Sequence, residues 1–207
     1  MKISRGAGIS FFVILLLVID QVIKILVKTN MTIGQSIHVC GDWFQIYFIE
    51  NMGMAFGMQF GAAPGKIILS VFRVVLVIAI IWYIKKLLKK KDTPTGVLVG
   101  LAAILCGALG NIVDSLFYGV IFSESTFTQV AQIFPEGGGY SSLLLGKVVD
   151  MFYFPVIDTF LPSWVPFWGG EHIIFFRPIF NFADSCITCG AIYLLLFKWR
   201  FFSSEKQ

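Results

Sequence analysis

Charged residues are scarce in this sequence of 207 residues: Asp, Glu, Lys and Arg make up 14%, against about 25% in soluble globular domains. Hydrophobic residues make up 57%, and 22 residues are phenylalanine. This composition excludes an ordinary soluble domain and predicts a single polytopic membrane domain over residues 1–207. The net charge of +4 comes from segregated basic residues, so we expect no nucleic-acid partner.

Histidine and cysteine are too few and too scattered for most metal or nucleophile chemistry. The two histidines, His38 and His172, lie in different segments, whereas a zinc site needs a tight cluster of ligands. Cys186 and Cys189 have Cys-x-x-Cys spacing, but no second pair or suitable histidine accompanies them, so we interpret them as packing residues. We therefore expect no metal, no cofactor and no Ser or Cys nucleophile activated by histidine.

Four apolar segments are long enough to cross the ~30 Å hydrocarbon core of a membrane, which takes about 20 helical residues. They cover residues 8–27, 66–84, 96–117 and 178–197. The sequence thus predicts an all-α membrane protein with four transmembrane helices. No internal repeat of the kind common in transporters accompanies them.

Basic residues indicate the orientation of these helices. Most of them lie before the first segment, between the second and third, or after the fourth: Lys2, Arg5, Lys85, Lys86, Lys89, Lys90, Lys91, Lys198, Arg200 and Lys206. The positive-inside rule makes this side cytoplasmic, with both termini inside. Residues 28–65 and 118–177 are then outside. We expect a small extracytoplasmic β-sheet around residues 43–49, and a long outer loop whose Trp164 and Trp168 lie at the membrane surface.

Four aspartates are predicted to converge near the outer face of the membrane. Asp20 would lie ~10 Å below the outer end of the first helix and Asp184 ~9 Å below the start of the fourth. Asp114 falls in the last turn of the third helix, and Asp150 follows an apolar pair that could fold back onto the same place. An ionisable group at membrane depth is costly, so this convergence indicates a functional site.

The neighbours of these acids favour a polar cavity. Three pairs have helical spacing that places both members on one face: Asp20 with Lys24, Asn111 with Asp114, and Asn181 with Asp184. Gly107 and Gly110 would let another helix approach closely. The Asp20–Lys24 pair is equally compatible with a structural ion pair whose lysine reaches to the interface. The pair at Asn111 is equally compatible with hydrogen bonding between helices.

Taken together, these residues resemble the lipoprotein signal peptidases of bacteria (signal peptidase II), a family of membrane aspartic peptidases with four helices. The matching motifs occur in the family's order: Asp20-Gln21-x-x-Lys24, Asn51-x-Gly53-x-Ala55-Phe56, Gly107-Ala108-Leu109-Gly110-Asn111-x-x-Asp114, Val148-Val149-Asp150 and Phe180-Asn181-x-Ala183-Asp184. The resemblance implies that Asp150 and Asp184 are the catalytic pair. It gives the remaining motif residues a role in substrate binding or support: Asp20, Lys24, Asn51, Gly53, Asn111, Asp114, Asn181 and Ala183.

The implied activity is removal of the signal peptide from diacylglyceryl-modified prolipoproteins, by cleavage before the lipidated cysteine. The implied setting is the bacterial inner membrane, with a monomeric enzyme in contact with lipid and sensitive to the cyclic peptide globomycin. The main alternative is a small proton- or ion-coupled transporter, which also places acids at membrane depth. A non-catalytic scaffold would leave the converging acids without an explanation.

Two features depart from the family pattern. Ser115 stands where the family usually has arginine, so the contact made by that arginine is lost or supplied by another residue, such as Arg177. The outer region is also longer than in compact members, with insertions near residues 119–146 and 155–176. This elongated form is similar to members from the Bacteroidetes lineage.

Overall fold

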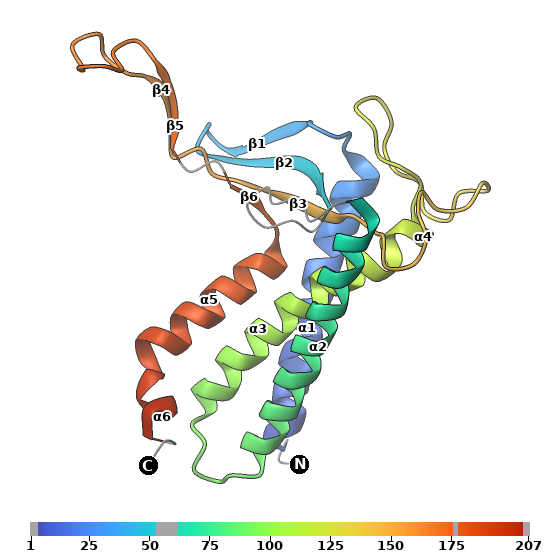
Figure 1. Ribbon diagram of the computed structural model, residues 1–207, viewed down its shortest axis with the longest axis vertical. Helices are drawn as coiled ribbons and strands as arrows, with labels where there is room; N and C mark the ends of the chain where they lie inside the picture. The colour runs from blue at the N-terminus through green and yellow to red at the C-terminus, as the bar shows by residue number, and fades with distance from the viewer. Residues whose placement is uncertain (1–3, 53–61, 176–177, 205–207) are drawn as a thin grey trace.

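The computed structural model describes residues 4–52, 62–175 and 178–204. The part described is mostly helical, with a small antiparallel sheet at one end of a helix bundle (Figure 1). Its helices are α1 (Arg5–Asn30), α2 (Ala62–Leu88), α3 (Thr95–Val113), α4 (Gly119–Ile121), α5 (Phe182–Phe197) and α6 (Trp199–Ser204). A π-helical turn, η1 (Asp114–Tyr118), joins α3 to α4, so these three form one continuous rod.

Local sequence explains where two of the helices begin. The Ser4 side chain accepts a hydrogen bond from the backbone N–H of Ala7 and so caps α1. Asn181 caps α5 in a reciprocal capping box with Asp184. The prediction that the fourth helix begins at residue 178 is therefore wrong, because its cap is Asn181.

The helices predicted at 8–27, 66–84 and 96–117 are present, each extended beyond the predicted ends. Among the described residues, two helical stretches are long and apolar enough to cross a membrane, Arg5–Asn30 and Thr95–Ile121. α5 is apolar but shorter, with 16 residues. α2 has 27 residues, or ~40 Å at 1.5 Å per residue.

Four strands form the antiparallel sheet in the order β1-β2-β3-β6. Their bounds are β1 (Ser36–Cys40), β2 (Phe44–Asn51), β3 (Val148–Tyr153) and β6 (Ile179–Phe180). The sheet expected around residues 43–49 is confirmed as the β1–β2 pair. The connection between α4 and α5 also joins it, because Phe180 and Ile179 pair with β3 rather than starting the fourth helix.

Two buried apolar clusters hold the molecule together. One lies between the helices, with α3 at its centre. The second lies beneath the sheet and joins the C-terminal end of α1, η1, β2, β3 and the connection after α4: Val27, Met31, Phe48, Tyr118, Phe122, Ala131, Val149 and Met151. The sheet is thus fixed on top of the bundle and not tethered only by its loops.

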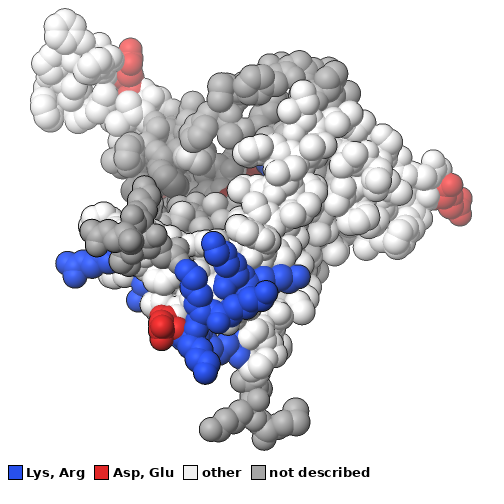
Figure 2. Space-filling view, turned by 60° about the horizontal axis from the view of Figure 1, so that its bottom comes forward, with Lys and Arg blue, Asp and Glu red and all other residues white. Residues whose placement is uncertain are grey.

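Opposite ends of the bundle differ in charge. Both termini lie at the end with the α2–α3 loop, away from the sheet (Figure 1). Figure 2 shows Lys and Arg side chains gathered at that end, where Lys85, Lys86, Lys89, Lys90 and Lys91 are all exposed. The segregation of basic residues predicted from the sequence is present in the fold.

A hairpin of β4 (Ile157–Phe160) and β5 (His172–Phe175) projects away from the sheet (Figure 1). Its far end carries large exposed side chains: Phe167 is 96% exposed, Trp164 79% and Trp168 60%. The predicted location of both tryptophans at a membrane surface stays a prediction.

Candidate active site

A buried ion cluster joins α1 to the end of α3. Asp20, Lys24 and Asp114 are each 0% exposed. The Lys24 Nζ atom lies 3.0 Å from an Asp20 oxygen and 2.8 Å from an Asp114 oxygen. Lys24 therefore does not reach to the interface. A buried ion pair needs further hydrogen bonds to offset its loss of solvent, and this cluster has them.

Those further hydrogen bonds connect three helices. The Gln21 amide donates to Asp20 Oδ2 and to Asp114 Oδ1, both at 3.0 Å. Asp20 Oδ1 accepts the backbone N–H of Ala183 at 2.9 Å, which fixes the first turn of α5 against α1. Asp20 thus fixes the start of α5 against α1, and its ion pair with Lys24 holds the Asp20 side chain in place.

Asn111 connects this ion cluster to Asp184. Its side-chain amide donates to Asp184 Oδ1 at 2.8 Å. Its side-chain oxygen accepts two hydrogen bonds, one from Lys24 Nζ at 3.0 Å and one from the side-chain amide of Asn181 at 3.2 Å. Every polar atom of the Asn111 side chain is therefore used within the protein.

Asp184 lies in the first turn of α5, at the sheet end of the helix. Its backbone N–H donates to the Asn181 side chain at 2.9 Å, and Asp184 Oδ2 accepts the Asn181 backbone N–H at 3.4 Å. The depth of ~9 Å below the helix start was based on a start at residue 178 and is wrong. The capping box puts the carboxylate at the junction of bundle and sheet.

Asp150 reaches the same junction from β3. Its Oδ1 accepts the side-chain amide of Asn181 at 2.6 Å, and its Oδ2 accepts that of Asn51 at 3.3 Å. The side chain is buried, and burial together with the charge of Asp184 raises the pKa of Asp150 to about 7. The Asn181 side chain therefore links the two residues: its nitrogen donates to the Asp150 carboxylate, and its oxygen accepts the backbone N–H of Asp184.

Close helix contact is what brings these groups together. A Cβ atom added at Gly107 would lie 2.2 Å from the Ala183 carbonyl oxygen, and one at Gly110 would lie 2.5 Å from Asp20 Oδ2. The expected role of both glycines is confirmed. Ala183 is 0% exposed, so its small side chain belongs to the same tight contact.

Arg73, on α2, is a charged residue near the site that the sequence reasoning passed over. Electrostatic interactions link its guanidinium to Asp184, Asp114 and Asp150. The sequence did contain a signal, because Arg73 interrupts an apolar run and an intramembrane charge indicates a functional position.

Ser115, which stands where the family usually has arginine, is buried. Its hydroxyl donates a hydrogen bond to the backbone carbonyl oxygen of Asn111 at 3.0 Å.

Some predicted residues lie outside the described part of the chain, namely Gly53 in the second motif and Arg177. Within the described part, no group of three or more His, Cys, Asp or Glu residues could hold a metal ion. Its cysteines are free, with Cys106 and Cys186 buried and Cys40 and Cys189 exposed.

Comparison with known proteins assigns this arrangement to a family. The family described as signal peptidase (SPase) II matches residues 12–200. The chain belongs to the signal peptidase II family. This is a family of aspartic peptidases, in agreement with the carboxylates brought together at the site.

Relatives named lipoprotein signal peptidase match the chain over nearly its whole length. The Porphyromonas gingivalis protein is 53% identical over 195 residues, covering 94% of this chain and 84% of the relative. The Amoebophilus asiaticus protein is 38% identical and covers 95% of this chain and 78% of the relative. The Pelodictyon phaeoclathratiforme protein is 33% identical and covers 94% of this chain and 93% of the relative.

The fold matches a solved bacterial membrane enzyme. Its structure, determined by the in meso method at 1.9 Å resolution, superposes with a TM-score of 0.59 and 22% identity, over 91% of this chain and 90% of that one. The likeness shows that this signal peptidase II family member has a membrane-enzyme fold.

Proposed function

We propose that this member of the signal peptidase II family cleaves diacylglyceryl-modified prolipoproteins before the lipidated cysteine, with Asp150 and Asp184 as its catalytic residues. The observation that carries the proposal is the pair of acids brought together from β3 and α5 and bridged by Asn181. Two nearby carboxylates cannot both ionise cheaply, so together they retain one proton near neutral pH.

The environment of Asp150 favours it as the holder of that proton, because its pKa is raised to about 7. Asp184 is then the base that takes a proton from the attacking water. The resulting hydroxide forms a bond to the scissile carbonyl carbon while Asp150 donates its proton toward the carbonyl oxygen. As the carbon–nitrogen bond breaks, the proton held by Asp184 passes to the leaving amine, and one hydroxyl of the diol returns its proton to Asp150, which restores both acids.

The amides around the pair set its geometry. Asn181 and Asn111 are 0% and 6% exposed, and both donate to the acids. Both therefore orient the carboxylates and have little capacity left for substrate. Asn51 contacts Asp150 at the end of β2, where it is half-buried and better placed to meet a substrate backbone.

The proposed setting is the bacterial inner membrane, with α1, α2, the α3–η1–α4 rod and α5 as spans of one domain over residues 1–207. Basic side chains gather at the end that holds both termini, which supports a cytoplasmic location for that end. The acids then lie near the periplasmic face. A substrate held by its signal helix and acyl chains reaches the site from the membrane, and a monomer suffices because one chain supplies both acids.

A gel-shift assay with purified protein and diacylglyceryl-modified prolipoprotein tests this proposal. Wild type should cleave only the lipidated precursor, and Asp150→Asn and Asp184→Asn should abolish cleavage while inserting normally. Substantial activity in one single mutant would remove that residue from the pair. No cleavage by inserted wild type, with a substrate confirmed as competent, would favour the proton-coupled transporter.

A further inference from the structure

A second cluster of buried charges lies close to the first but shares no residue with it. Lys28, near the end of α1, forms an ion pair with Glu50 on β2, and their side chains are 0% and 2% exposed. Ser125 donates to Glu50 Oε1 at 2.9 Å and accepts Lys28 Nζ at 2.9 Å. Lys147 Nζ lies 3.4 Å from the other carboxylate oxygen of Glu50.

The register of the sheet places this cluster behind Asp150. Ile49 pairs with Asp150 and Glu50 pairs with Val149. Because successive side chains of a strand point to opposite faces, Asn51 and Asp150 share one face while Glu50 points to the other. These neighbours in sequence therefore have different partners: Asn51 contacts Asp150, and Glu50 contacts Lys28 on the other face of the sheet.

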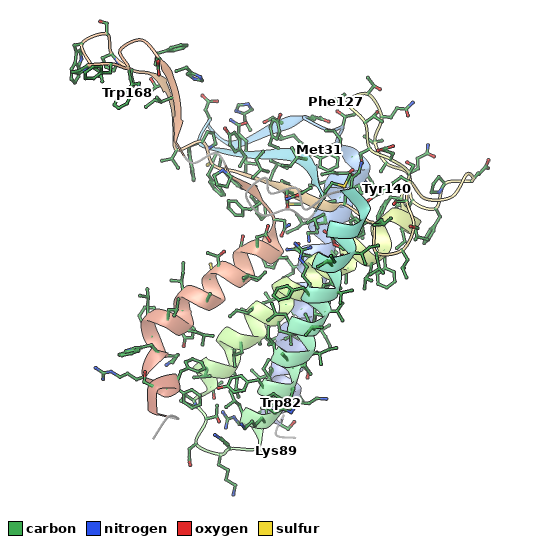
Figure 3. All side chains as sticks on the ribbon, viewed as in Figure 1. Met31, Trp82, Lys89, Phe127, Tyr140 and Trp168 are labelled. Carbon is green, nitrogen blue, oxygen red and sulfur yellow. The ribbon has the colours of Figure 1, made fainter. Side chains whose placement is uncertain are left out.

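Most residues around the Lys28–Glu50 ion pair come from the long connection between α4 and β3. Ser125, Tyr140 and Lys147 all belong to the region between α4 and β3. The Tyr140 ring lies under both cations, 5.1 Å from Lys28 Nζ and 5.2 Å from Lys147 Nζ. Figure 3 shows Tyr140 beside the outer end of the bundle near Met31, which belongs to the apolar cluster against which Tyr140 packs.

We propose that Glu50 is a positioning residue for the catalytic pair: it binds the outer connection and α1 to the end of β2, and so holds Asn51 against Asp150. This inference rests on the proposed catalytic role of Asp150. It gives the insertion near residues 119–146 a function, because that insertion supplies Ser125 and Tyr140 and leads directly into Lys147. A buried carboxylate whose Oε1 atom contacts both Lys28 and Ser125 has little freedom to move, and the strand it belongs to shares that constraint.

Glu124 provides a matched control. Its carboxylate also pairs with Lys147, at 2.9 Å, but its side chain is 61% exposed. Glu50→Gln and Glu124→Gln therefore remove the same charge from the same lysine. Only the first should disturb the strand that carries Asn51. We expect Glu50→Gln to lower kcat by about tenfold to hundredfold, the effect of a displacement near 1 Å at a catalytic group. Glu124→Gln should keep the wild-type kcat.

The pH profile separates positioning from simple support of the fold. The Asn51 amide stabilises ionised Asp150, so its displacement raises the pKa of Asp150. With Asp150 as proton donor, the alkaline limb of the plot of kcat against pH then moves to higher pH by about one pH unit. The same movement is expected in Asn51→Ala. Other charged groups around Asp150 remain in place in this test: Asp184 on α5, Asp20 and Lys24 on α1, Asp114 on η1 and Arg73 on α2.

The experiment measures kcat, KM and the alkaline limb for wild type, Glu50→Gln, Glu124→Gln and Asp150→Asn. If Glu50→Gln does not insert, Ser125→Ala replaces it and should shift the limb in the same direction. A wild-type limb in the variant that inserts, or an equal loss in Glu124→Gln, would overturn the positioning role. Activity in Asp150→Asn would instead overturn the proposed catalytic pair, so the two failures are distinguishable.

Discussion

Replacing Gly107 by alanine should damage catalysis without removing any polar group of the site. The added Cβ would lie 2.2 Å from the Ala183 carbonyl oxygen, whereas ordinary contact begins near 3.4 Å, so the two helices must separate by about 1.2 Å. The obstacle is backbone and cannot rotate away. Overpacking of this kind costs about 1–3 kcal/mol of stability.

The separation would act directly on Asp184, which follows Ala183 in the first turn of α5. A misplacement near 1 Å at a catalytic group costs about a hundredfold in rate, so kcat of Gly107→Ala should fall by that order. The assay is steady-state cleavage of the lipidated precursor, with thermal unfolding in detergent measured in parallel. Gly8→Ala is the matched control, because a Cβ there meets nothing within 4 Å. A wild-type kcat in Gly107→Ala would refute the claim that close α3–α5 contact positions the acid.

Further predictions concern charge. Lys24→Met leaves two buried carboxylates without their cation and should cost about 3–5 kcal/mol; an unchanged unfolding temperature would contradict this. Arg73→Gln removes a cation whose field reaches Asp150, so the alkaline limb of the pH–rate profile should move to higher pH. Arg73→Lys should restore it, and Lys85→Gln on the same helix should have no effect. In wild type, cleavage should decline as the pH rises through about 7, because Asp150 then loses the proton it donates; a rate that keeps rising to pH 9 would exclude that assignment.

The helices were largely predictable, because each apolar run is long and its ends are marked by charge. The start of α5 was not. Residues 178–181 continue the apolar pattern of the helix, but Ile179 and Phe180 pair with β3, and Asn181 is the cap. A sequence pattern cannot distinguish a short strand followed by a cap from one more helical turn, because the partner strand is about thirty residues away in the chain.

The site shows the same division. Sequence order and topology were enough to expect Asp20, Asp114, Asp150 and Asp184 near one another. They did not reveal that Asn181 contacts both Asp150 and Asp184, or that Arg73 belongs to the same electrostatic environment. Those relations depend on side chains from different elements meeting at a few ångströms.

By itself the sequence determined a membrane protein with a segregated basic end and acids at the opposite end, because hydrophobicity and charge act locally along the chain. Tertiary structure alone decided which groups became partners. Lys24 turns inward to two acids, Asn111 is fully used by the protein, and Glu50 faces away from Asp150 while its neighbour Asn51 faces toward it. Each of these outcomes is set by strand register and helix contact, which exist only once distant segments have packed together.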